Sequence, residues 1–165
     1  MLCPQYSAKA LPKNIQISKF PCNSAYLKFI FARLKHQDYL SGMKQNFDVK
    51  GGPQIGRENL PKLRAKLADA GLDGVYVPHE DEYQNEYLPD ANERLAWVSG
   101  FTGSFGSALI LQDRAAIFVD GRYTIQAADQ TDHNLFERVA VPDPGPFGWL
   151  AQQDLTGKTI GYDPA

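Results

Sequence analysis

Leucines spaced three and four residues apart form the first clear pattern of the chain, with charged residues between them. They are Leu60, Leu63 and Leu67. This spacing predicts a helix with one buried face. Asn59 can cap that helix, and Pro61 fits its first turn, where a missing N–H has no cost. Gly71 is expected to end it.

Short apolar runs bounded by turn residues follow the helix and predict strands. These strands are residues 74–77, 108–111, 115–119, 136–141 and 159–162. The tight connection 112–114 predicts that the strands on either side of it form an antiparallel hairpin. Further helices are expected over 122–131 and 147–153. Helices and strands in this mixture predict an α/β domain.

The strand over 115–119 runs directly into Asp120, Gly121 and Arg122. We expect Asp120 and Gly121 to form a turn and Arg122 to lie in the first turn of the helix that follows. In that helix Tyr123, Ile125, Ala127 and Ala128 are the residues available for burial. The guanidinium of Arg122 would then lie at the end of a buried strand.

The charge changes abruptly along the chain. Residues 1–42 hold six Lys or Arg and one acidic residue, whereas the rest of the chain is net acidic. Residues 25–40 have apolar residues at helical spacing, but residues 1–24 have no clear period. We therefore expect residues 1–45 to be an extension, either mobile or upstream of a natural start at Met43, and residues 46–165 to be the folded domain.

The composition is that of a soluble globular protein. The 165 residues suffice for one domain, and the net charge of −2 gives no general attraction to nucleic acid. No apolar run approaches the roughly 20 residues that span a membrane. Cys3 and Cys22 are the two cysteines, so the main body has no disulfide framework. A reducing compartment, the cytoplasm, is the simplest expectation.

The sequence contains no recognisable metal-binding or nucleophilic pattern. His36, His79 and His133 lack the spacing of metal ligands, and neither cysteine has an evident catalytic partner. His79 is expected at the surface, at the end of a strand. Residues 100–106, GFTGSFG, could cradle a phosphate but lack the GK[ST] ending of a P-loop and precede a strand. Tight turns and close backbone approach are the favoured interpretation of these glycines.

Four ordered motifs in the chain resemble the N-terminal domain of the creatinase/aminopeptidase P superfamily. They are DEYQNEY at 81–87, ERLAWVSGFTGSFG at 93–106, FVDGRYTIQAA at 118–128 and GYDP at 161–164. Between about residue 46 and residue 165, the order and spacing of these motifs are similar to those found in the Xaa-Pro aminopeptidase branch. The exact motifs favour this branch over prolidases and creatine amidinohydrolases.

The resemblance implies a mixed β-sheet flanked by helices, of the ribonuclease-H-like kind. In the long enzymes of this family a similar second domain follows, and then a pita-bread domain binds two divalent metal ions, usually manganese. These enzymes remove an N-terminal residue that precedes proline. This chain stops at the end of the first domain, without the metal ligands or catalytic histidines, so we expect it to be inactive alone.

Arg122 is the residue that the resemblance marks as a substrate contact, because the arginine of the matching motif reaches the peptide in related enzymes. The alternative is an ion pair with Asp120 or with an acid of residues 80–93. The expected partner of the full enzyme is a peptide with proline in second position, and a homodimer is left open. The alternative function is a free-standing interaction or regulatory domain without catalysis.

Overall fold

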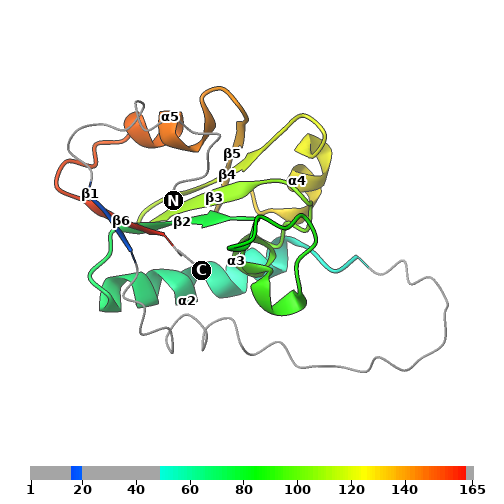
Figure 1. The fold of residues 1–165 in the computed structure, drawn as a ribbon, viewed down its shortest axis with the longest axis horizontal. Coiled ribbons are helices and arrows are strands. Elements are labelled where there is room, and N and C mark those ends of the chain that lie inside the picture. Colours follow the sequence, from blue (N-terminus) through cyan, green and yellow to red (C-terminus); the bar gives the residue numbers. More distant parts are fainter. Residues whose placement is uncertain (1–15, 20–48, 163–165) are drawn as a thin grey trace.

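The computed structural model describes residues 16–19 and 49–162, and these form a sheet with helices on both faces (Figure 1). The strands are β1 (Gln16–Lys19), β2 (Gly74–Pro78), β3 (Ser107–Leu111), β4 (Ala115–Val119), β5 (Glu137–Ala140) and β6 (Thr159–Tyr162). The helices are α2 (Pro53–Asp69), α3 (Arg94–Ser99), α4 (Thr124–Gln130) and α5 (Gly145–Ala151), with a 3₁₀ turn at Asp90–Asn92. The predicted α/β class is confirmed.

The sheet is mixed, with the strand order β1-β6-β2-β3-β4-β5. Strand β3 is antiparallel to both of its neighbours, and the predicted hairpin of β3 and β4 is confirmed. The other pairs are parallel. Strands β2 and β4 therefore run in the same direction, and their carboxyl ends lie at the same end of the sheet.

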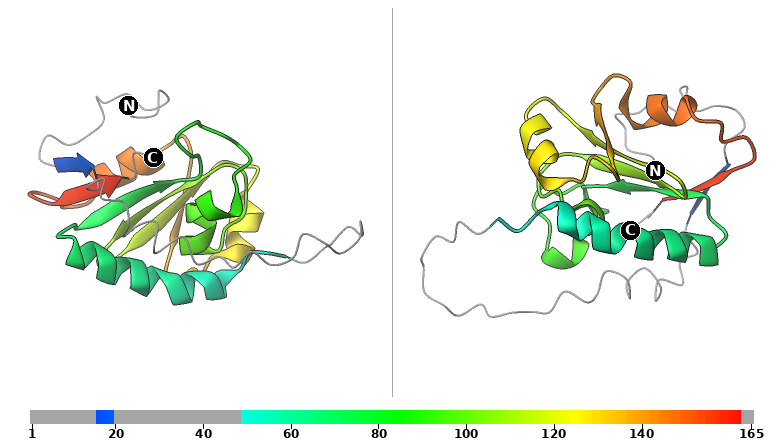
Figure 2. Two further views of the ribbon diagram at one scale, coloured as in Figure 1. Left: turned by 60° about the horizontal axis from the view of Figure 1, so that its bottom comes forward. Right: turned by 180° about the vertical axis from the view of Figure 1, so that it is seen from behind.

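Each face of the sheet carries its own apolar core. Along β4, Ile117 and Val119 pack on the face covered by α2 and α3, whereas Phe118 packs on the face covered by α5 (Figures 1 and 2). The ring of Phe118 meets Trp149 of α5 edge-on, with ring centroids 6.0 Å apart. Burial on both faces explains why the central strands are continuous apolar runs rather than alternating ones.

Helix α2 begins six residues before the predicted cap at Asn59. It starts at Pro53, so Pro61 lies inside the helix rather than in its first turn. The buried face of α2 extends back to Gly56, which lies close to Phe136 and to the backbone of Ser99. Because glycine has no side chain, the apolar pattern of the sequence gave no sign of this earlier turn of the helix. The amide of Asn59 instead donates to the carbonyl oxygen of Trp97, at 2.9 Å, and ties α2 to α3.

Strand β1 lies within the segment that the sequence analysis assigns to an extension. It pairs in parallel with β6, and Gln16 lies opposite Thr159 (Figure 2). The boundary at residue 45 stays a prediction. The predicted apolar stripe at 25–40 lies outside the described residues.

A close backbone contact joins the start of α2 to the end of α3. The N–H of Gly52 donates to the carbonyl oxygen of Gly100, at 3.0 Å. Gly100 has a φ of 84°, and a Cβ on it would lie 2.1 Å from the carbonyl oxygen of Gly52. Both the positive φ and the backbone contact require glycine here.

Gly100→Ala is therefore expected to destabilise the domain by about 2–3 kcal/mol, because it combines a left-handed backbone with a clash against backbone atoms. The measurement is urea unfolding followed by circular dichroism. Gly121→Ala is the matched control, since a Cβ at Gly121 has no atom within 4 Å. Equal stability of the two variants would contradict the role assigned to Gly100.

A buried carboxylate ties α2 to the connection between α4 and β5. Asp132 accepts a hydrogen bond from the Nε of Arg57 and a second one from the backbone N–H of Asn134. The Arg57 guanidinium, with the N–H of Asn134, lowers the pKa of Asp132 to about 2. The carboxylate is thus preferred in the folded chain.

The pKa of Asp132 gives a pH-dependent prediction. Because its folded value lies below the unfolded value of about 3.9, Asp132 stabilises the fold above the unfolded pKa, and this contribution is lost as the pH falls toward the folded pKa. We expect Asp132→Asn to lower the Tm at pH 6, and the gap to the unmodified chain to close near pH ~2. Asp129→Asn, at an exposed residue of α4, is the control. A gap that is independent of pH would refute this assignment.

Candidate functional site

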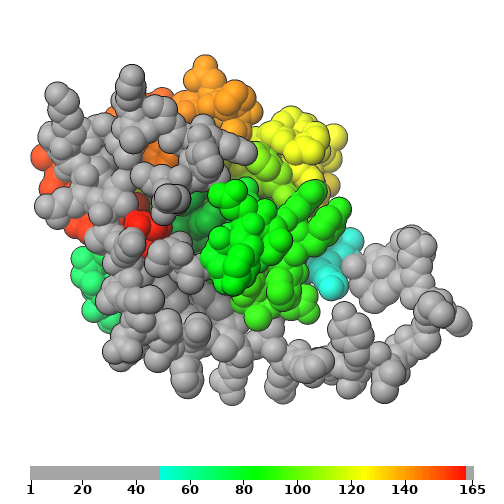
Figure 3. Space-filling model, in the orientation of Figure 1, coloured from blue at the N-terminus to red at the C-terminus, as the bar shows by residue number. Residues whose placement is uncertain are grey.

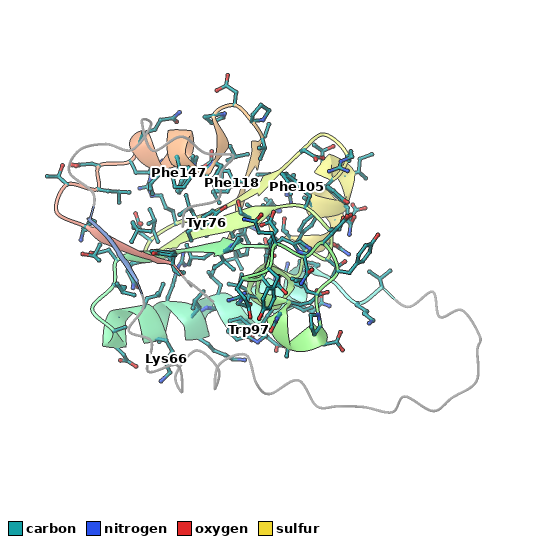
Figure 4. All side chains as sticks on the ribbon, in the orientation of Figure 1. Lys66, Tyr76, Trp97, Phe105, Phe118 and Phe147 are labelled. Atoms are coloured by element: carbon teal, nitrogen blue, oxygen red, sulfur yellow. The ribbon has the colours of Figure 1, made fainter. Side chains whose placement is uncertain are left out.

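Three loops meet at the end of the sheet where β2 and β4 finish. Residues 79–93 follow β2, residues 100–106 precede β3, and residues 120–123 follow β4. The backbone joins the first two, since the N–H of His79 donates to the carbonyl oxygen of Gly106, at 3.0 Å. Phe105 lies at this end, near α4 (Figure 4). In α/β sheets this end of the strands is where ligands commonly bind.

Arg122 lies in a turn and not in a helix as predicted. Helix α4 begins at Thr124, after Tyr123. The carboxylate of Asp120 accepts the backbone N–H of Arg122, at 2.9 Å, and the Asp120 carbonyl accepts the N–H of Tyr123, at 3.0 Å. Such side-chain bonding to the backbone two residues on is the preference of aspartate in turns. In α4, Ile125 and Ala128 are exposed, against the prediction that they are available for burial, whereas Ala127 is buried as expected.

The Asp120 carboxylate also binds the guanidinium of Arg122 along one edge. Nη2 of Arg122 donates to Oδ2, at 2.7 Å, and Nε donates to Oδ2, at 3.0 Å. The hydrogen bonds from Arg122 hold the pKa of Asp120 below its usual value, and those to Asp120 raise the pKa of Arg122. The ion pair named as the alternative for Arg122 is therefore present.

The rest of the guanidinium remains accessible. The Arg122 side chain is 68% exposed. Within the described part of the chain, Nη1 of Arg122 donates to no acceptor. The guanidinium carbon lies 5.3 Å from the ring centroid of Tyr123 and 5.9 Å from that of Phe105. One edge is thus fixed by Asp120, two rings lie alongside, and the edge formed by Nη1 and Nη2 can bind an acceptor.

The Tyr123 ring is held in place by the other two loops. Its hydroxyl lies 2.8 Å from the hydroxyl of Ser104, which in turn donates to Oε1 of Glu86, at 3.1 Å. The ring also meets Phe101 edge-on, with centroids 5.8 Å apart. Tyr123 therefore couples the Arg122 turn to the loops at 100–106 and 79–93.

The loop at 79–93 is ordered by Asp81. Its carboxylate accepts the backbone N–H groups of Tyr83 and Asn85, each at 3.0 Å, which is a common arrangement for aspartate in turns. His79 is buried, and its Nε2 lies 3.0 Å from the carbonyl oxygen of Glu86, so the expectation of a surface histidine was wrong. Figure 3 shows the part of the chain around this loop, in green, on the outer surface of the molecule.

The glycine-rich loop at 100–106 is a tightly packed connection. Gln130 of α4 accepts the backbone N–H of Thr102, at 3.0 Å, and returns a bond from its amide to the Thr102 hydroxyl. A Cβ on Gly103 would lie 2.3 Å from the ring of Phe101. These contacts agree with the prediction that the glycines allow tight turns and close backbone approach.

No group of three or more His, Cys, Asp or Glu residues among the described residues could hold a metal ion. No helix among them is long and apolar enough to cross a membrane.

The fold and the loop cluster define an α/β domain with an exposed arginine at the carboxyl ends of its strands. Residues 60–165 match the family model of the creatinase/prolidase N-terminal domain, and the chain belongs to this family. The probable Xaa-Pro aminopeptidase P of Coccidioides posadasii (strain C735) is 37% identical over 133 residues, which is 79% of this chain and 20% of that protein. The corresponding Chaetomium globosum protein is 41% identical over 110 residues, 64% of this chain and 18% of that protein.

A solved structure is similar to the same part of the chain and comes from the same class of enzyme. The X-prolyl aminopeptidase of Caenorhabditis elegans, described as a cytosolic enzyme with a di-nuclear active site, has a TM-score of 0.58 and 30% identity. The match covers 66% of this chain and 20% of that one. The chain thus spans about one fifth of the length of the relatives it matches. The predicted resemblance to the N-terminal domain of Xaa-Pro aminopeptidases is confirmed.

The sequence singles out Arg122 as a candidate but does not identify the residues that surround it. Ser104 and Glu86 stand within the motifs at 93–106 and 81–87, but the sequence assigns no contact to either. Phe105 and Tyr123 were not connected to Arg122. No spacing rule links these residues, since Glu86 and Tyr123 come from different loops that only the sheet brings together.

The hydroxyl contact between Ser104 and Tyr123 is expected to couple the two loops by about 0.5–1 kcal/mol. A double-mutant cycle with Ser104→Ala and Tyr123→Phe, measured by urea unfolding, gives this coupling energy. The Tyr123→Phe variant keeps the ring beside Arg122 and removes only the hydroxyl. Strictly additive effects would mean that the contact does not hold the ring.

Proposed function

We propose that this chain is the accessory N-terminal domain of a metal-dependent Xaa-Pro aminopeptidase, which removes the residue ahead of a proline in second position. The substrate is then a peptide with proline as its second residue. The proposal is supported by the family of the chain and by relatives that carry the Xaa-Pro aminopeptidase name. The domain would form one wall of the substrate entrance.

The observation that carries the proposal is the accessible edge of Arg122. A guanidinium remains charged at every working pH and offers donors in a fixed plane. Asp120 fixes its direction, and its Nη1 faces no acceptor among the described residues. Arg122 can therefore hold a peptide oxygen without any movement of the fold.

The chemistry of hydrolysis would reside in a separate catalytic domain. Two divalent metal ions, expected to be manganese, would activate water and polarise the scissile carbonyl there. The described residues of this chain do not fit a metal, since no suitable cluster exists among them. Its own part would be to bind and orient the peptide, in the cytoplasm, and the chain alone would not cleave it.

A chimera tests this proposal. The full chain, which includes β1, replaces the matching segment of the Caenorhabditis elegans relative, and hydrolysis of Xaa-Pro peptides is measured. We expect the chimera to be active, and Arg122→Ala to lower its kcat/KM by at least about tenfold, the loss of one charge-assisted hydrogen bond.

Arg114→Ala is the matched control for Arg122→Ala. Arg114 is also exposed and also paired with an aspartate close by in sequence, Asp113, but it lies in the β3–β4 turn at the opposite end of the sheet. A chimera that folds by circular dichroism yet cleaves no Xaa-Pro peptide would contradict the proposed function. An equal loss in both arginine variants would contradict the role of Arg122.

A further inference from the structure

The charge around Arg122 is negative overall, although the residue that faces solvent is a cation. Asp120 pairs with it at 2.7 Å and compensates its charge. The carboxylate of Glu86 is held nearby by Ser104, next to the Tyr123 hydroxyl, and acts electrostatically on Arg122. One cation with two carboxylates leaves this site with a net charge of about −1.

The loop that carries Glu86 is itself acidic. Residues 79–93 contain six acidic residues and no Lys or Arg. The nearest base in the sequence after them is Arg94, which is buried and acts on Asp81. An anion that approaches the free edge of Arg122 therefore meets the carboxylates of Asp120 and Glu86 besides the guanidinium.

A neutral oxygen meets the same donors without this repulsion. The carbonyl of a peptide bond accepts hydrogen bonds from a guanidinium but carries no net charge. A terminal carboxylate would gain charge attraction from Arg122 and lose it again to Asp120 and Glu86. Specificity can rest on such an unfavourable element as much as on an attractive one.

We infer that Asp120 makes Arg122 a site for the neutral main-chain carbonyl of an extended peptide and discriminates against a free terminal carboxylate at that position. The inference rests on the proposed function, because it concerns the peptide that Arg122 would hold. The substrate class is then peptides that continue past the site, with an amide rather than a carboxylate opposite Arg122. Asp120 is thus a specificity-determining and positioning residue.

Two peptides that differ only at their carboxyl end test this inference. The full chain is labelled with ¹⁵N, and the Nε–Hε signal of Arg122 is followed during titration with Ala-Pro-Ala-Ala as the free acid and as the carboxyl-terminal amide. We expect the amide to bind about threefold more tightly, the scale of an exposed charge interaction. Arg122→Lys identifies the signal by its disappearance.

Asp120→Asn is the decisive variant. Its side-chain oxygen can still accept the N–H of Arg122 and keep the turn, while the negative charge is removed. The preference for the amide should fall to about one or reverse. Asp113→Asn changes the net charge of the chain equally, at the opposite end of the sheet, and should leave the preference unchanged.

The outcomes separate this inference from the proposed function. Tighter binding of the acid, or an unchanged preference in Asp120→Asn, overturns the inference and leaves Arg122 as a peptide contact. An equal change in Asp113→Asn also overturns it, because the preference would then follow net charge alone. If neither peptide moves the Arg122 signal, the inference and the peptide-binding role of Arg122 both fail.

Discussion

The antiparallel strand β3 lies between β2 and β4, and the site depends on this pairing. Because β3 opposes both neighbours, the carboxyl ends of β2 and β4 fall at the same end of the sheet as the start of β3. Three loops are thereby brought within hydrogen-bonding distance of one another. The contact between Gly52 and Gly100 then closes this end from the side of α2. Without this strand pairing, nothing else in the fold would bring together the side chains of Glu86, Ser104 and Tyr123.

Arg122 is held by local and by distant contacts that have different consequences. Asp120 lies two residues away and fixes the guanidinium through the turn itself. The ring of Phe105 belongs to a loop distant in sequence. Tyr123 is the next residue after Arg122, but its ring is held by Ser104 of that same distant loop, so the positions of both rings depend on the whole sheet. The local contact sets the charge of the site, and the distant ones set where that charge lies. A substitution of Asp120 therefore changes the net charge at Arg122, whereas a substitution of Phe105 changes the position of the guanidinium.

The elements could be predicted from sequence where the pattern of burial is simple. Strand β4 was predicted with its observed bounds, because a strand buried on both faces is a continuous apolar run bounded by polar residues. Helix α2 was predicted too short, since Gly56 is buried without contributing an apolar side chain. Helix α4 was predicted to begin too early, because the aspartate turn at Asp120 competes with helix formation at Arg122.

From the sequence, the candidate site was predictable only as a single residue. A motif marks Arg122, but the hydroxyl of Ser104 and the ring of Phe105 acquire their roles from tertiary contacts alone. The sign of the local charge is likewise a property of the folded chain, since it needs Glu86 and Asp120 near one guanidinium. An arginine in a motif suggests an anion as its ligand. Once its charge is compensated by a fixed aspartate, the same arginine is better suited to a dipole, and the ligand class follows from the neighbours rather than from the arginine.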